Sequence, residues 1–291
     1  MSVIAPYAHR ARHLAYDAVS CRAAHDGPPA ATASRLVPRS AVVVAAVIGY
    51  FGVRGLTDGS QGTALHNAAR VQATERFLHL DWESPLQDLV VDDRTVTRVL
   101  NWIYIFGHWP VIALTLLWLL SRHPEVYTRA AGAMLFSGAA GLVVFAAFPV
   151  APPRLAAPGM TDTVTRQSHA YRVLQPPAFT DQYAAMPSLH VGWNLLMTLA
   201  VLAATRKVWL RVLAVALTVS MDATVVLTAN HYVLDALAGA ALAHAGWYAA
   251  GHLRSRPRFR LRLRLRRGGI ASAVSRRGLP SATGLPRRPG A

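Results

Sequence analysis

Two short segments place histidine at the start of long apolar stretches of the chain. The first is MPSLH at 186–190 and the second is NHYVLD at 230–235. His231 and Asp235 lie four residues apart, so on a helix they share a face, where the carboxylate can accept from one imidazole nitrogen. The other nitrogen can then attack phosphorus, and His190 can donate a proton to the departing oxygen. These three residues are the predicted catalytic set.

Residues near the two segments are suited to binding the oxygens of a phosphate. Arg154, in the sequence PPRL, has a planar guanidinium that can donate two parallel hydrogen bonds. Pro187 and Ser188 are predicted to lie in the first turn of a helix, where free amides and a hydroxyl can bind an anion. Asn230, beside the nucleophile, and Tyr183, in the loop before MPSLH, are further predicted substrate contacts.

Two other polar residues lie inside predicted membrane spans, where ionisable groups are costly and often functional. Asp222 is predicted to bind a hydroxyl of the acceptor or to pair with a basic group, with a structural hydrogen bond or a water-filled cavity as the alternative. His108 is predicted to make an ordinary interhelical hydrogen bond.

Other chemistries fit the same residues less well. Two histidines and a carboxylate also resemble a facial metal triad, but Arg154 and a helix N-terminus favour an anion. Ser188 and His190 are two apart and point in different directions on a helix, which disfavours an acyl-hydrolase dyad. A packing role would explain one histidine at the end of a span better than two. The predicted reaction requires no metal and no cofactor.

Composition indicates a membrane protein. Of the 291 residues, 53% are hydrophobic and only 15% are charged, which is too apolar for an ordinary soluble domain. Six stretches are about long enough to span a bilayer, at 40–56, 100–120, 130–149, 188–205, 208–228 and 232–253. The predicted fold class is all-α, a polytopic bundle of about six transmembrane helices.

The distribution of basic residues predicts the orientation of these helices. With the N-terminus inside, the cytoplasmic segments 1–39, 121–129, 206–211 and 254–291 carry most of the 30 Lys and Arg residues. Both termini are then cytoplasmic, and the long loop 150–186 and the starts of the fourth and sixth spans face outward. We therefore expect a multi-pass protein of the cell membrane whose active site faces the extracytoplasmic side.

The domain organisation follows from the same pattern. Residues 1–39 are predicted to be a disordered segment, residues 40–253 the membrane catalytic domain, and residues 254–291 an Arg-rich disordered tail. Within the domain, the stretch 62–93 is predicted to include a helix, 64–80, that lies on the outer membrane interface.

The net charge of +16 does not indicate a nucleic-acid partner. The excess is concentrated in the tail, where Arg alternates with Leu or Phe directly after the last predicted span. Such a segment is expected to set the topology and to attract anionic lipid headgroups. Cys21 is the single cysteine, so neither an intrachain disulfide nor a multi-cysteine zinc site is expected.

The two segments, with FPVAPPRL at 148–155, resemble the second, third and first signatures of the type 2 phosphatidic acid phosphatase superfamily. The similarity covers about residues 67–250. Within the superfamily, the chain resembles the inositol phosphorylceramide synthase-like branch more closely, and Asn67, Arg70 and Glu75 are part of that resemblance. The fold implied is a membrane helical bundle.

The resemblance also implies roles for individual residues. By the match, His231 attacks phosphorus, Asp235 orients it, His190 is the acid, and Arg154 and Ser188 bind the phosphate.

Three positions depart from the superfamily's pattern. Ala147 stands where its first signature usually has Lys, Leu189 where its second has Gly, and Val225 where its third has Arg. Fewer cations suit a phosphodiester or another lipid phosphate of lower charge better than a phosphate monoester dianion.

The predicted function is a membrane phosphotransferase that acts on lipid phosphate or phosphodiester headgroups through a phosphohistidine, with a polyol such as inositol among the possible acceptors. A lipid phosphate phosphatase is the alternative in the same superfamily, and a catalytically silent lipid-binding or transport protein is the alternative from another class. Donor lipid, acceptor and oligomeric state are not fixed by the sequence.

Overall fold

The structure is a computed structural model that describes residues 60–167 and 182–255, all of which belong to one compact unit, Tyr50–Ala291. Within the described residues every regular element is a helix, and the only strand-like pairing is an isolated parallel bridge between Val150 and Ala184. The all-α prediction is confirmed. The predicted span 40–56, the segment 1–39 and the tail beyond residue 255 lie outside the described residues.

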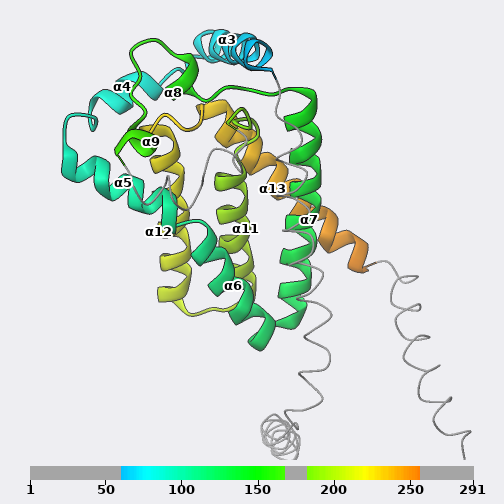
Figure 1. The fold of residues 1–291 in the computed structure, drawn as a ribbon. Helices are drawn as coiled ribbons and strands as arrows, with labels where there is room; N and C mark the ends of the chain where they lie inside the picture. The colour runs from blue at the N-terminus through cyan, green and yellow to red at the C-terminus, as the bar shows by residue number, and fades with distance from the viewer. Residues whose placement is uncertain (1–59, 168–181, 256–291) are drawn as a thin grey trace, which may run out of the picture. The chain divides into compact units, whose positions relative to one another are not determined.

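The helices follow the predicted apolar stretches closely (Figure 1). They are α3 (Gln61–Leu78), α4 (Glu83–Asp88), α5 (Arg94–Phe106), α6 (Trp109–Arg122), α7 (Pro124–Ala147), α8 (Pro153–Ala156), α9 (Thr163–Gln167), α11 (Leu189–Ala204), α12 (Val208–Leu227) and α13 (Val233–Ser255). The predicted helix 64–80 is therefore α3, and the predicted loop 150–186 contains two short helices, α8 and α9.

Within the described residues, fewer helices meet the length and composition of a membrane span than the six predicted for the chain. By length and composition, α7 and α12 can each cross a membrane, and α5 with α6 can form a third, bent span. α11 has 16 residues, fewer than a bilayer normally requires. The described residues therefore support a membrane protein with two or three such spans, and the prediction of six is not confirmed.

The predicted span 100–120 is two helices that meet at an angle of 41°. α5 ends at Phe106, Gly107 follows, and α6 begins at Trp109 with Pro110 in its first turn. Proline has no backbone N–H and disfavours helical geometry in the residue before it, so a straight helix cannot pass through this point. The bend leaves His108 buried at the junction.

Polar contacts join α11 to its neighbours within the bundle. The Thr198 and Thr218 hydroxyls lie 2.8 Å apart, and Thr218 donates to the Asn194 carbonyl, which links α11 to α12. On the α7 side, the Trp193 indole donates to the Ser137 hydroxyl at 3.1 Å. Such bonds between helices stabilise packing where water does not compete.

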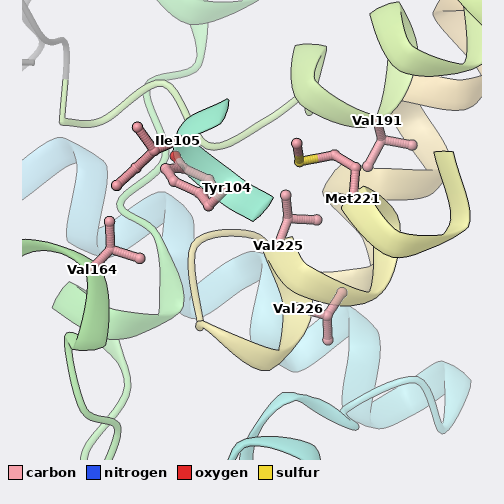
Figure 2. Close-up of a cluster of buried hydrophobic side chains, with 7 residues drawn as sticks. All are labelled: Tyr104, Ile105, Val164, Val191, Met221, Val225 and Val226. Carbon is pink, nitrogen blue, oxygen red and sulfur yellow. The ribbon is translucent and has the colours of Figure 1, made fainter. Parts of the chain in front are cut away.

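An apolar cluster packs α5 and α9 against α11 and α12 (Figure 2). Its buried members are Tyr104, Ile105, Val164, Val191, Met221, Val225 and Val226. The cluster fixes the end of α12, and with it the start of the turn that leads to His231.

The chain directions bring four helix ends together at one end of the bundle. α7 and α12 finish there, α11 and α13 begin there, and α3 is bonded to the same end through Ala64, whose carbonyl accepts from Ala151. The segments MPSLH and NHYVLD are therefore neighbours, as their predicted placement at one side of the membrane requires.

Candidate active site

The turn after α12 carries His231 away from the helix in a fixed direction. The amides of Asn230 and His231 both donate to the Val225 carbonyl at 3.0 Å, and Ala229 adopts a left-handed conformation with φ of 53°. A left-handed residue commonly ends a helix, although the residue is usually glycine. Backbone geometry alone thus determines where the His231 side chain leaves the chain.

The orientation of the His231 ring is set by a backbone carbonyl. Its Nδ1 lies 2.8 Å from the Ala185 oxygen and 3.6 Å from Asp235 Oδ2. A carbonyl oxygen can only accept, so Nδ1 carries the hydrogen and Nε2 keeps its lone pair. Asp235 Oδ2 accepts from the Tyr232 amide at 2.9 Å, so the predicted partner supports the turn and lies beyond hydrogen-bonding distance of the imidazole.

Helix α3 and the first signature position Ala185. Val150 donates to the Tyr183 carbonyl and accepts from the Ala185 amide, which forms the short parallel bridge. The Asn67 side chain donates to the Pro149 carbonyl at 2.9 Å and so fixes Val150 from the other side. Through this pairing, α3 helps to position the carbonyl that bonds His231 Nδ1.

His190 lies in the first turn of α11, close to His231. The centroids of the two imidazole rings are 5.6 Å apart. The His190 ring also stacks on Tyr104 at 4.8 Å and lies 4.5 Å from His108, whose Nδ1 is 3.2 Å from the Asn194 side-chain nitrogen. His108 does make the interhelical contact predicted for it, and the bend between α5 and α6 brings it beside His190.

Ser188 is the N-cap of α11 rather than part of its first turn. Its hydroxyl accepts from the Val191 amide at 3.4 Å, and its own amide donates to the Asp235 carbonyl at 2.9 Å. Gly239 packs against the Ser188 carbonyl so closely that a Cβ would not fit. Pro187 precedes the cap, which corrects its predicted place in the helix, and Ser188 joins α11 to α13 directly behind the two histidines.

Both the backbone amide and the side chain of Arg154 make hydrogen bonds that fix its position. Its amide donates to the Ala229 carbonyl at 2.9 Å, and its Nε donates to Asn230 Oδ1 at 3.0 Å. Asp162 Oδ1 is 3.9 Å from the same Nε. The Asn230 amide group donates in turn to the Thr228 hydroxyl at 2.7 Å. Asn230, predicted as a substrate contact, therefore orients Arg154 and immediately precedes His231.

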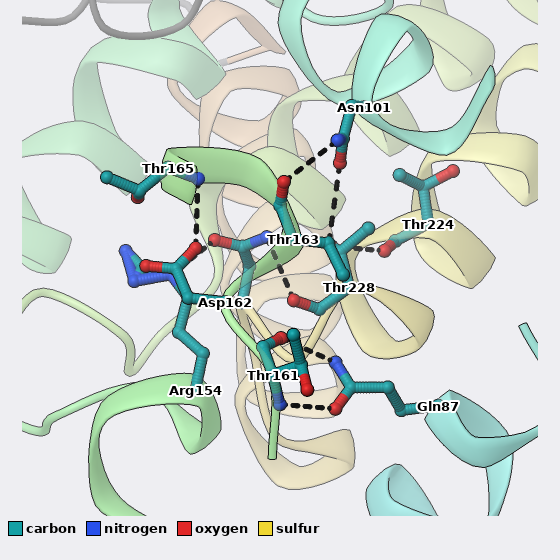
Figure 3. A network of polar contacts seen from close by, with 10 residues as sticks. Gln87, Asn101, Arg154, Thr161, Asp162, Thr163, Thr165, Thr224 and Thr228 are labelled. Carbon is teal, nitrogen blue, oxygen red and sulfur yellow. Dashed lines mark hydrogen bonds and ion pairs between the residues drawn. The ribbon is translucent and has the colours of Figure 1, made fainter. Parts of the chain in front are cut away.

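A network of side chains holds the segment that carries Asp162 (Figure 3). Gln87 of α4 makes two hydrogen bonds with the Thr161 backbone, and Asn101 of α5 donates to the Thr163 carbonyl. Asp162 itself accepts from the Thr165 amide. Because three helices fix this segment, Asp162 has a defined position beside Arg154.

Two buried glutamates lie on the other side of His231, outside the membrane-spanning helices. Glu75 of α3 accepts from the Leu234 amide and Glu83 of α4 from the Val233 amide, each at 2.8 Å. Burial, together with the negative charge of Glu83, raises the pKa of Glu75 to about 8, and burial also raises the pKa of Glu83. The two carboxyl groups are hydrogen-bonded to each other, which requires a proton on one of them.

Two predicted site residues lie apart from this arrangement. Tyr183 packs against the apolar cluster around Tyr232 and Val150, and its carbonyl accepts from Val150. Asp222 has a buried Oδ1 with no hydrogen-bond partner in the described part of the chain, and no hydrogen bond there joins it to the other candidates. Among residues 60–167 and 182–255, no three His, Cys, Asp or Glu side chains are arranged to hold a metal ion.

Sequence reasoning missed the Ala185 carbonyl and the role of Glu83. A backbone acceptor leaves no trace in residue types, and Glu83 lies in a polar stretch, DWESP, that reads as an exposed connector. Glu75 was noticed through the family resemblance, but its contact with α13 depends on tertiary structure.

Comparison with known proteins agrees with the geometry. A family model described as PAP2 superfamily matches residues 69–249, which is more than half of the chain and includes His190, His231, Asp235 and Arg154. No curated protein and no solved structure matches the chain.

Proposed function

The chain belongs to the PAP2 superfamily, and we propose that it is a membrane phosphotransferase that uses His231 as the nucleophile on a lipid phosphate or phosphodiester. Membership itself indicates a phosphatase or phosphotransferase type of activity on lipid phosphates. The observation that carries the finer proposal is the bond from His231 Nδ1 to the Ala185 carbonyl, beside the His190 ring.

The first half of the proposed reaction forms a phosphohistidine. Because Nδ1–H is bonded to Ala185, the Nε2 lone pair of His231 attacks phosphorus. The bond from phosphorus to the leaving oxygen breaks, and protonated His190 gives its proton to that oxygen. Arg154 binds the non-bridging oxygens as their negative charge increases.

The second half transfers the group to a hydroxyl. Neutral His190 takes the proton of the acceptor while its oxygen attacks phosphorus, and the bond to His231 Nε2 breaks, which restores the starting enzyme. An alcohol such as a polyol gives a phosphotransferase, and water gives a phosphatase. The chemistry needs no metal and no cofactor.

The surroundings of the site support a substrate of low charge. Val225, at the usual arginine position of the third signature, is buried in the apolar cluster of α12. Ala147, at the usual lysine position, is an exposed last residue of α7. Arg154 is then the guanidinium placed beside His231, and one arginine suits a phosphodiester better than a dianionic monoester. The proposed site opens to the outer leaflet.

The test is turnover of labelled lipid phosphates by the purified protein, with and without polyols such as inositol. A new phospholipid or phospho-polyol supports the transferase, and free phosphate alone supports the phosphatase. We expect His231→Ala and His190→Ala to lower turnover by at least about 1,000-fold while the protein stays folded, and EDTA to have no effect.

A matched control is His244→Ala in α13. His244 also has its Nδ1 2.9 Å from a carbonyl, that of Ala240, but it is exposed and lies outside the three signatures. Its replacement should leave turnover unchanged. Full activity of the His231 variant would overturn the mechanism, and bound lipid without turnover under any acceptor would support a silent lipid-binding protein instead.

A further inference from the structure

Three consecutive amides after His231 are each bonded to a different carboxyl group. Tyr232 donates to Asp235, Val233 to Glu83 and Leu234 to Glu75, at 2.8 to 2.9 Å. The first amides of a helix have no partner within the helix, and a single side-chain cap from a nearby residue is the usual solution. Here two of the three acceptors come from other helices, α3 and α4.

All three carboxyl groups are buried, and basic partners are scarce. Glu75 is 1% exposed, Glu83 4% and Asp235 0%. Within the described residues, no Lys or Arg side chain forms a salt bridge with any of them. Three buried anions this close would repel one another strongly, and the positive end of the α13 dipole can offset only part of that repulsion.

We propose that Glu75 and Glu83 are positioning residues for the reaction, which share one proton and together hold the first turn of α13 so that His231 keeps its direction. This inference rests on the proposed function, in which His231 is the nucleophile. The two glutamates do not touch the reacting atoms; they act through the backbone of residues 232–234.

The hydrogen bonds are complete only with one shared proton. Protonated Glu75 donates to Glu83 and accepts from Leu234, while ionised Glu83 accepts from both Glu75 and Val233. Loss of the proton places two anions side by side and pushes α3 and α4 apart at the turn.

Other titratable groups also lie near Glu75 and Glu83. They are Asp235 of α13, whose charge raises the pKa of both glutamates, and Tyr232, whose hydroxyl accepts from Gln72. His231 follows next, 3.6 Å from Asp235. None of these groups supplies a positive charge at alkaline pH, so they cannot compensate when the shared proton leaves.

The proposal is tested by the pH dependence of turnover in matched variants, from about pH 6 to about pH 10. Glu75→Gln imitates the protonated group, because its amide can donate to Glu83 and its oxygen can accept from Leu234. For wild type we expect turnover to decline near pH 8. For Glu75→Gln we expect turnover at neutral pH within about threefold of wild type and no such decline. Asp88→Asn, an exposed carboxylate at the end of α4, is the control and should keep the wild-type profile.

Two further variants separate charge from hydrogen bonding. The double variant Glu75→Gln with Glu83→Gln keeps both bonds to α13 but removes the charge, and should lower turnover by roughly tenfold. Glu75→Ala leaves the Leu234 amide without its partner and should lower turnover by a similar factor or more. An alkaline decline that is the same in Glu75→Gln and wild type, or wild-type turnover in Glu75→Ala, would overturn the proposal.

A second measurement does not depend on catalysis. Hydrogen exchange at the amides of Val233 and Leu234, corrected for the intrinsic effect of pH, should accelerate in wild type above about pH 8 and not in Glu75→Gln. If wild type turns over no lipid phosphate but shows this exchange pattern, the proposed function fails and the shared proton stands. If turnover is normal and exchange is the same in both proteins, the shared proton fails alone.

Discussion

The two flanks of His231 are built from opposite kinds of contact. Before His231, Asn230 accepts a hydrogen bond from the guanidinium of Arg154, the cation that we propose binds the substrate. After it, the amides of residues 232–234 are bonded to buried carboxyl groups that meet only the backbone. The segment before His231 therefore presents a positive charge that can bind an anion, and the segment after it is bonded to acidic side chains.

The difference between the two flanks shows how the orientation of His231 can be fixed by acidic groups while a negatively charged phosphate can still reach its ring. Carboxylates near the phosphate would repel it, so those that support the turn are bonded to the amides of α13 and kept away from the Arg154 side. The Ala185 carbonyl, which is neutral, orients the ring between the two flanks. Variants of each flank should therefore fail in different ways.

The largest effect is expected from Arg154 on the substrate flank. Arg154→Ala should lower kcat/KM for lipid phosphate by roughly 100-fold, because it removes the donor that stabilises charge on the transferring group. Arg154→Lys should recover only part of the loss, since a point charge lacks the planar fork. Arg76→Ala, an exposed arginine of α3, is the matched control. Equal losses in the Arg76 and Arg154 variants would show that general surface charge, and not this contact, matters.

A smaller effect, on stability rather than turnover, is expected from the carboxylate flank. Glu75 has a pKa of about 8 when folded and 4.5 as its ordinary value. Between these two values the unfolded chain loses the proton while the folded chain keeps it, so stability should fall as pH rises from about 5 to about 8. The melting temperature in detergent should decline with pH more steeply for wild type than for Glu75→Gln, which has no group to titrate there. Parallel curves would contradict the assignment.

The smallest effect is expected from Asp162, whose carboxylate lies beside Arg154. Its oxygen is 3.9 Å from Nε, which is too long for a hydrogen bond, so we expect this contact to contribute little. Asp162→Asn keeps the bond from the Thr165 amide and removes a competitor for the guanidinium. The KM for an anionic lipid should fall, by no more than about threefold. A rise in KM would mean that Asp162 orients Arg154 instead of competing with the substrate.

Much of the fold follows from local pattern. Apolar length predicted α11, α12 and α13 to within two residues of their ends, whereas α7 begins six residues before its predicted span. The polar residues at 186–190 and 230–235 were predicted on one side of the membrane, because both segments precede a span that starts from that side. The predicted span 100–120 was wrong as a single helix, because mean apolarity continues across Gly107 and Pro110 while the backbone does not. The prediction of six spans is not confirmed, and one of the six lies outside the described residues.

The candidate site was less predictable where it depends on tertiary contacts. The i, i+4 spacing placed Asp235 near His231, but the closest acceptor is a carbonyl 46 residues away in sequence. Helical spacing cannot anticipate an acceptor supplied by a different segment. Glu83 reached α13 from 150 residues away, and no spacing rule connects the two.

The left-handed turn at Ala229 limits how this protein can be redesigned. Because one left-handed residue, Ala229, sets the direction of the chain after α12, adding or deleting a residue there would rotate the imidazole away from the Ala185 carbonyl. It would also move Arg154, whose amide is bonded to the Ala229 carbonyl. A β-branched residue would resist that φ value, whereas glycine would adopt it freely. Any attempt to move this chemistry onto another helical scaffold therefore has to copy the length and handedness of this turn before it copies the histidine.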